Sequence, residues 1–478
     1  MIKNFFFDKA FWKVTLSLAL PIAIQNMLTS SYVLIDTIMV GQLGDVALSA
    51  VGMAGQLNWL MNMLVFGICS GASVFFAQYW GIGDRTMIRK IYGIALSATI
   101  AISILFFLFG FFGTESVIRI FNRDNSVVLA GTQYLKIACF SYFAAAINML
   151  FCTLLRSTEE VKLPMYVSVF TTFMNAILDY ALIFGAFGLQ KMGIEGAALA
   201  TVISAWSGPV LLLIISMVKR NMMIAPLKEL FGFSVDEVKA FFRRATPVIL
   251  NEGMWGLGTI LYNVIYSNMG YEYYAAVTIL RTFENIAFVF FVGLCNASSV
   301  MVGKSIGAGK IKRGVTDARR FTLIMPIISI ISGLLIVAFR TQLVGIFNLN
   351  GTITKKTFDA ALTIIVLYGF HIAIRNIPYI QIVGVFRSGG DTKKGVKYDL
   401  ICLWMIALPV TFISAYYLKL PFPVVYALMY ICEDYIKSIL CLKYFKSMKW
   451  IKPVTPEGIT GLSEYQKIKH PFFESEVS

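Results

Sequence analysis

"LPIAIQNMLTSSYVLIDTIMVGQLG", residues 20–44, is the stretch that decides the fold, and Asp36 is its one charged residue. A helix that crosses the roughly 30 Å hydrocarbon layer of a membrane needs about 20 mostly apolar residues, and this stretch supplies them. An ionised carboxylate is costly in hydrocarbon, so such a residue faces a cavity or a partner. The stretch therefore predicts a membrane-spanning helix that carries a functional acid.

The rest of the chain has the composition of a membrane protein. It is 58% hydrophobic and 14% charged, against about 25% charged in soluble domains. The apolar runs are much longer than the roughly ten-residue strands of a membrane β-barrel, which favours an all-α bundle. Twelve runs predict twelve transmembrane helices, near residues 14–40, 53–80, 91–113, 131–155, 163–187, 194–218, 245–269, 274–303, 321–346, 359–386, 397–418 and 422–445.

The positive charge follows the expected topology. The net charge is +15 and the chain holds 41 Lys and Arg. Most of them fall in the termini and in the even-numbered loops, and an excess of Lys and Arg marks the cytoplasmic side. This predicts cytoplasmic termini and contact with anionic membrane lipids, and it argues against nucleic acid as a partner. The N-terminus lacks the cleavage site of a removable signal peptide.

The chain repeats itself at an offset of 226 residues. Six spans precede the second copy, so both copies have the same orientation, an arrangement found in transporters with two lobes around a central site. A duplicated scaffold or receptor is the alternative. The matching segments are "LPIAIQ" from Leu20 with "TPVILN" from Thr246, "GIGDR" from Gly81 with "GAGKI" from Gly307, and "IRIFN" ending at Asn122 with "VGIFN" ending at Asn348.

The repeat predicts four parts of the chain. Residues 1–218 form an N-terminal lobe of six helices, and residues 219–244 a basic cytoplasmic linker. Residues 245–447 form a C-terminal lobe of six helices. Residues 448–478, with Pro453, Pro456 and scattered charges, are expected to be a loose cytoplasmic tail.

Polar residues of the first half gather on helix faces. A stripe with the spacing i, i+4, i+7 and i+11 runs along the first helix: Gln25, Thr29, Tyr32 and Asp36. Further polar residues lie at plausible depths in later helices: Asn148, Asn175, Asp179 and Thr201. Two nearby carboxylates in a low dielectric cannot both be charged cheaply, so Asp36 and Asp179 would hold a proton or a cation. The alternative is two independent polar contacts between helices.

The second half also carries charges inside its apolar runs: Glu252, Arg281, Glu284, His371 and Arg375. One interpretation is neutralisation across helices, with Glu252 paired to Arg281 or Arg375. The other is a direct role toward substrate or protons. Near the end of the last run, Glu433 and Asp434 lie about one turn from Lys437, which indicates a structural pairing.

Motifs of catalysis and of ATP hydrolysis do not occur. "GAGKIKRG" from Gly307 lacks the first glycine and the Ser or Thr of a phosphate-binding loop. There is no HExxH or GxSxG motif, and only two His are present. We therefore expect no enzyme activity, no cofactor and no metal beyond Na⁺ at Asp36, Asn175 and Asp179. An intramembrane hydrolase that uses Asp36 and Asp179 is the alternative.

Several motifs together resemble the multidrug and toxin extrusion (MATE) family, in its prokaryotic branch. They are "LPIAIQNMLTSSYVLIDTIMVGQLG", "GDRTMIRK", "LLRSTEEVKLPMYV", "NAILDYALIFG", "GIEGAALATVIS" and "VFRSGGDTKKGVKYD". The resemblance implies two six-helix lobes around a V-shaped cavity in the bacterial inner membrane. It also implies export of bulky, often cationic compounds in exchange for H⁺ or Na⁺, by a chain expected to be a monomer.

The resemblance places the cation site on Asp36, Asn175, Asp179 and Thr201, and we add Tyr32 from the polar stripe. Glu252 matches an acid of the seventh helix in part of the family, whereas Asn376 stands where some members carry an acid. A flippase for lipid-linked precursors, from the same superfamily, is the alternative function. The residues expected to line the cavity for drug-like molecules are Gln25, Asn148, Glu252, Trp255, Tyr262, Arg281, Glu284, His371 and Arg375.

Overall fold

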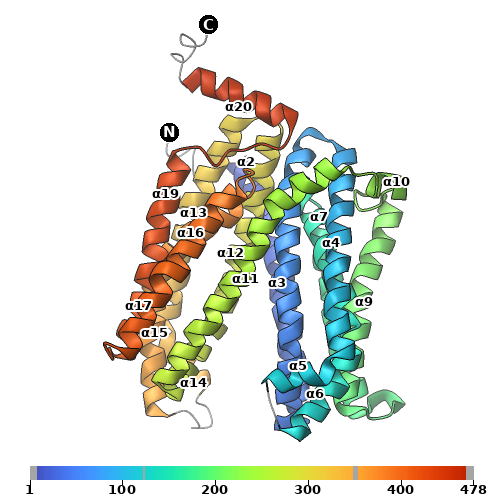
Figure 1. Ribbon diagram of the computed structural model, residues 1–478, viewed down its shortest axis with the longest axis vertical. Helices are drawn as coiled ribbons and strands as arrows, with labels where there is room; N and C mark the ends of the chain where they lie inside the picture. The colour runs from blue at the N-terminus through green and yellow to red at the C-terminus, as the bar shows by residue number, and fades with distance from the viewer. Residues whose placement is uncertain (1–7, 122–123, 348–353, 470–478) are drawn as a thin grey trace. The chain divides into compact units, whose positions relative to one another are not determined.

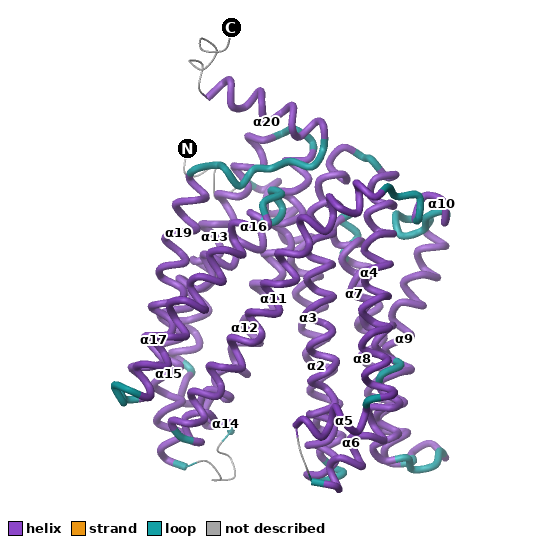
Figure 2. Tube along the Cα trace, in the orientation of Figure 1, coloured by secondary structure: helices purple, strands orange, loops and turns teal. Residues whose placement is uncertain are grey.

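The protein is helical throughout the part that the computed structural model describes, residues 8–121, 124–347 and 354–469. Figures 1 and 2 show helices joined by short loops. The only strand-like pairing in these ranges is an isolated bridge between Gly390 and Ile451. The all-α prediction is confirmed. The third repeat match ends at Asn122 and Asn348, which lie outside the described residues.

All twelve predicted runs lie on helices. In the described ranges, nine helices are long and apolar enough to cross a membrane, and the pair α6–α7, bent by 51°, adds a tenth. The two remaining runs lie in the more polar α11 and in α18–η4–α19. The long helices are α2 (Lys9–Gly41), α3 (Asp45–Ile82), α4 (Arg85–Phe112), α6 (Asn125–Ala138), α7 (Ser141–Ser157), α8 (Lys162–Phe184), α9 (Gly193–Lys219), α11 (Val235–Met269), α12 (Tyr271–Gly307), α13 (Ile311–Ala338) and α15 (Lys355–Tyr379).

The last two spans are each interrupted by a π-helical segment. A third such segment, η2 (Ile380–Phe386), extends α15. The pieces of the last two spans are α16 (Thr392–Leu400), η3 (Ile401–Ala407) and α17 (Leu408–Tyr416), followed by α18 (Phe422–Tyr430), η4 (Ile431–Tyr435) and α19 (Ile436–Lys446). The short elements are α5 (Thr114–Phe121), η1 (Ala186–Gly188), α10 (Leu227–Leu230), α14 (Arg340–Ile346) and α20 (Pro456–Lys469).

The helices form two compact units. Unit 1 contains residues 1–20, 77–83 and 250–478, and unit 2 contains residues 21–76 and 84–249. These units follow the two sequence halves except for three exchanged segments. As a result α2, α3 and α11 each contribute residues to both units. In unit 2, α9 packs against α6, α7 and α8, and in unit 1 the helices α12, α13 and α15 pack against one another.

Two repeat-matched glycines let helix ends meet inside unit 1. A Cβ on Gly81 would lie 2.2 Å from the carbonyl oxygen of Lys304, and a Cβ on Gly307 would lie 2.1 Å from that of Gln78. Only glycine permits so close a backbone approach. The matching "GIGDR" and "GAGKI" turns are therefore contact points between the end of α3 and the end of α12.

The segment after residue 447 is packed, so the expectation of a loose tail is wrong for residues 448–469. Trp450 is fully buried, in a cluster with Phe386 and Phe445. The hydroxyl of Thr455 donates a hydrogen bond of 2.6 Å to the carbonyl oxygen of Gly307. The composition of the segment is polar, yet one large aromatic side chain and its backbone hydrogen bonds fix it to unit 1. Residues 470–478 lie outside the described ranges.

Candidate functional site

Unit 2 brings together the two acids that the sequence predicts as a pair. Asp36 comes from α2, and Asn175 and Asp179 come from α8, where the i, i+4 spacing places them on one face. The helix α8 runs without a break through both residues and ends where Gly185 adopts a left-handed conformation, with φ 77°. Asn175 and Asp179 are each 0% exposed. The two carboxylates are close enough to act on one another electrostatically.

This pair lacks the partners that buried charges normally have. Among the described residues, neither oxygen of Asp179 has a hydrogen-bond partner, nor has one oxygen of Asp36. The amide of Asn175 lies beside Asp179, but neither its oxygen nor its nitrogen makes a hydrogen bond of good distance and angle within the described residues. Buried polar groups are nearly always hydrogen-bonded, and exceptions call for an explanation such as a bound ion. Oxygen atoms of this kind suit a proton or a hard cation.

Neutral polar groups lie around the pair. The hydroxyls of Tyr32 and Ser204 are 3.1 Å apart and hydrogen-bonded. Thr201 donates to the carbonyl oxygen of Ala197, at 2.9 Å, and its hydroxyl lies beside those of Tyr32 and Tyr134. Tyr134 of α6 is buried and within electrostatic range of Asp36 and Tyr32. The surroundings are rich in oxygen and hold no basic side chain that pairs with either acid in the described chain.

Gln25 and Asn148, predicted for the substrate cavity, also lie in unit 2. The side-chain oxygen of Gln25 accepts hydrogen bonds of 2.6 and 3.2 Å from Arg156. Its nitrogen lies 3.3 Å from the sulfur of Cys152. Gln25 is therefore held between α2 and α7. Asn148 lies beside α9. A Cβ added to Gly208 of that helix would be 3.0 Å from the side-chain oxygen of Asn148.

The charges of unit 1 pair differently from the sequence prediction. Glu252 forms an ion pair of 2.8 Å with Arg387, so its predicted pairing with Arg281 or Arg375 is wrong. Arg375 instead pairs with Glu284. The reason lies in tertiary packing, because spacing along one helix does not determine which neighbouring helix comes close. No ion pair involves Arg281 in the described ranges, and Trp255 is 39% exposed.

A buried ionic cluster links α11, α15, α16 and the last span. Lys437 lies 3.0 Å from Asp399, 3.2 Å from Glu433 and 3.5 Å from Asp434. The predicted pairing of Lys437 with the two acids on its own helix is thus confirmed. The hydroxyl of Tyr262 donates to Glu433 at 3.1 Å, and His371 is 2.9 Å from Asp434. His371 is therefore a partnered core residue.

The match to a known protein family divides the chain into the same two halves as the sequence repeat. A sequence model of the family named MatE matches residues 21–181 and 247–413, one segment in each half of the chain. The chain belongs to the MatE family. It is accordingly a multi-pass membrane transporter, and the family resemblance inferred from its motifs is confirmed.

Individual MatE relatives are similar over most of their length. The probable multidrug resistance protein NorM of Thermotoga maritima is 27% identical over 451 residues, which cover 92% of this chain and 93% of that protein. The uncharacterized transporter YisQ of Bacillus subtilis is 22% identical and covers 91% and 94%. A crystal structure of MATE in complex with MaL6 superimposes with a TM-score of 0.83 at 18% identity, covering 91% and 95%. The MatE chain therefore has the fold of these transporters.

Sequence patterns missed several polar residues that this MatE chain brings to its two clusters. Tyr134 and Ser204 flank Asp36 and Tyr32, but neither stands out in an apolar run. Asp399 and Arg387 complete ion pairs in unit 1. Their charges were visible in the sequence, but Arg387 precedes and Asp399 follows a polar turn that fits an ordinary cytoplasmic loop.

Proposed function

We propose that this MatE transporter exports bulky, cationic drug-like compounds from the bacterial cytoplasm in exchange for H⁺ or Na⁺. The proposal rests on one observation: in the described chain no basic side chain neutralises the buried acid Asp179 or the half-buried acid Asp36 beside it. The name of the NorM relative supports the substrate class. The distribution of Lys and Arg supports an inner-membrane protein with both termini in the cytoplasm.

The coupling follows from the cost of burying the two acids. A proton or Na⁺ that binds at Asp36 and Asp179 removes the repulsion between them. Binding shifts a conformational equilibrium only if the ion binds the two conformations unequally. We infer that the ion-loaded pair favours the conformation that releases drug outside. An inward-moving charge gains about 2.3 kcal/mol per 100 mV of membrane potential, which can drive concentrative export.

Dye transport in inside-out vesicles tests the proposal. The vesicles would be given a pH gradient or a Na⁺ gradient, and accumulation of a fluorescent cationic dye would be followed. We expect Asp36→Asn to abolish gradient-driven accumulation, because the amide cannot gain or lose a proton and binds Na⁺ weakly. Asp45→Asn makes the same chemical change at an exposed position at the start of α3 and should leave accumulation unchanged.

The outcome distinguishes the alternatives. If Asp36→Asn accumulates dye as well as the native chain at an equal level of protein, Asp36 has only a structural role. If the native chain moves no cationic dye under either gradient but moves a fluorescent lipid-linked sugar, the flippase alternative is correct.

A further inference from the structure

A cavity that the transport proposal does not use lies within unit 1. Its volume is about 930 Å³, and its walls come from the start of α2, the end of α12, the start of α13 and the helix α20. These three long helices all begin or end at the cavity. It therefore lies at the edge of the membrane-spanning part, on the side that the distribution of Lys and Arg assigns to the cytoplasm.

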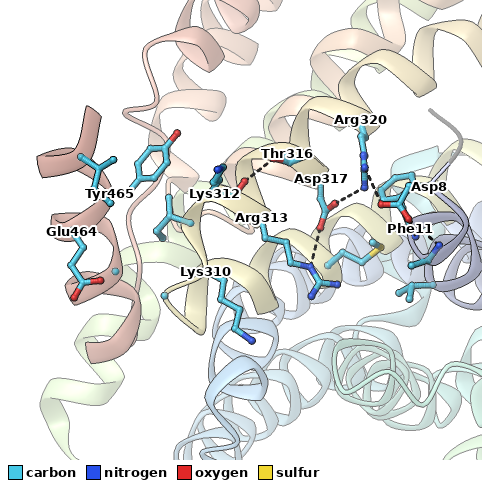
Figure 3. A pocket seen from close by; sticks show the side chains of 17 residues that line it. Asp8, Phe11, Lys310, Lys312, Arg313, Thr316, Asp317, Arg320, Glu464 and Tyr465 are labelled. Carbon is cyan, nitrogen blue, oxygen red and sulfur yellow. Dashed lines mark hydrogen bonds and ion pairs between the residues drawn. The ribbon is translucent and has the colours of Figure 1, made fainter. Parts of the chain in front are cut away.

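Two of the carboxylates in the cavity wall are already neutralised by arginines (Figure 3). Arg320 lies 3.0 Å from Asp8 and 3.5 Å from Asp317. Its guanidinium also stacks over the ring of Phe11, at 4.8 Å from the ring centre. Arg313 lies 3.9 Å from Asp317 and is itself mostly exposed. This chain of contacts fixes one wall of the cavity.

Positive charge remains beyond these pairs. Lys310 and Lys312 line the cavity and are exposed, and in the described chain neither ammonium group has an acidic partner. The third acid of the wall, Glu464, lies on α20 and is exposed. Figure 3 shows Lys310 and Arg313 projecting on the side of α13 away from Glu464. The side of the cavity formed by Lys310 and Arg313, which we call its basic mouth, can therefore attract an anion.

The remaining wall is apolar. Phe11 and Met301 are buried, Val14 is half-buried, and Ile468 of α20 is 83% exposed. Basic side chains beside apolar surface at the level of a membrane interface match a phospholipid, which has a phosphate group next to acyl chains. A free inorganic anion would use the basic mouth alone.

We propose that this cavity binds an anionic phospholipid, with the phosphate at Lys310 and Arg313, Lys312 adding positive charge nearby, and an acyl chain along Phe11, Val14 and Ile468. The site is separate from the carboxylate pair of unit 2. Its occupancy does not depend on drug or ion transport. A lipid bound here would contact α2, α12, α13 and α20 at once.

Binding of fluorescently labelled phosphatidylglycerol to the purified full-length chain in neutral detergent tests this. We expect the triple variant Lys310→Gln, Lys312→Gln, Arg313→Gln to bind the lipid at least tenfold more weakly, because each basic residue near an anionic lipid contributes several-fold. The matched control is Lys443→Gln, Lys446→Gln, Lys449→Gln, which removes the same charge from exposed positions outside the cavity. The control should change affinity less than twofold.

Two further measurements separate a lipid from a free anion. Ile468→Ser should weaken phosphatidylglycerol binding, and millimolar inorganic phosphate should not displace the lipid. Equal loss in both triple variants would show a general charge effect and would contradict the proposed site. Unchanged binding in the cavity variant would also contradict the proposed site. Displacement by phosphate, with no effect of Ile468→Ser, would identify an inorganic-anion site and contradict the lipid proposal.

Discussion

Lys437 is the cation that holds three carboxylates inside unit 1, with its ammonium 3.0 Å from Asp399 and close to Glu433 and Asp434. Removing one partner of a buried ionic cluster costs about 3–5 kcal/mol, because the remaining charges stay buried without compensation. We therefore expect Lys437→Met to lower the free energy of unfolding by about that amount. Thermal or denaturant unfolding of the purified protein in detergent measures it.

The control for this change lies on the same helix. Lys443→Met removes an exposed lysine of α19 and should leave stability within about 0.5 kcal/mol of the native value. Adding Asp399→Asn and Glu433→Gln to Lys437→Met should restore much of the loss. If Lys437→Met and Lys443→Met unfold alike, the cluster is not an energetic unit.

Asp391, in the turn before α16, is expected to make stability depend on pH. Burial raises the pKa of its carboxyl, but hydrogen bonds from Lys452, at 2.8 Å, and from Tyr444 outweigh burial and hold the pKa below its usual 3.8. A lowered carboxyl pKa stabilises the fold above the usual value, and this is lost as the pH falls through the folded-state value.

Asp391→Asn tests that dependence. At pH 7 the variant should be less stable by about 2 kcal/mol, the scale of hydrogen bonds to a charged group. The difference from the native chain should shrink as the pH falls below about 4. Melting curves of both proteins over that pH range provide the measurement. A difference that stays constant down to acid pH would show that the charge of Asp391 is not involved.

At the scale of elements, the contact between α3 and α12 depends on glycine. Gly81→Ala would place its Cβ 2.2 Å from a backbone carbonyl oxygen, which cannot move like a side chain. Such overpacking costs about 1–3 kcal/mol. Gly52 lies in the same helix with nothing within 4 Å of its added Cβ. Alanine there should stabilise the helix by up to about 1 kcal/mol. Opposite shifts in melting temperature are expected, and equal shifts would contradict the close contact.

The sequence predicted the membrane-spanning helices correctly, because the hydrocarbon environment alone determines their backbone structure. Twelve long apolar runs became helices because hydrocarbon leaves the backbone no other partner. The π-helical segment that carries Glu433 and Asp434 was not predicted, because it is a local rearrangement of helical hydrogen bonds without a composition of its own. The packing of the segment after residue 447 was not predicted. Its one fully buried aromatic residue, Trp450, leaves the mean hydropathy of this polar segment almost unchanged.

The same limit applies to the two charged sites. Asn175 and Asp179 share a face because the helical period requires it, and that much was predictable. The pairing of Glu252 with Arg387 was not, since 135 residues separate them along the chain and packing alone selects the partner. Periodicity therefore predicts which residues share a face. The identity of the facing helix needs the tertiary structure.

At the scale of the whole molecule, Asp36 lies on a helix that both units share. Residues up to Leu20 of α2 belong to unit 1, and residues from Pro21 onward belong to unit 2. Proline inside a helix removes one backbone hydrogen bond and permits a bend there. An ion bound at Asp36 would thus act on a helix that continues from one unit into the other. We expect ion binding to change the distance between the units.

Spin labels at two exposed positions test this expectation, one at Leu129 in unit 2 and one at Leu418 in unit 1. Pulsed electron resonance would record the distance distribution at high and low pH and with and without Na⁺. In the native chain the distance distribution should change when one of the two ions is added, because that ion binds the two conformations unequally. Asp36→Asn and Asp179→Asn should each remove the response, whereas Asp45→Asn should keep it. A response that persists in both acid variants would assign ion coupling to other residues, with the ionic cluster around Lys437 the next to test.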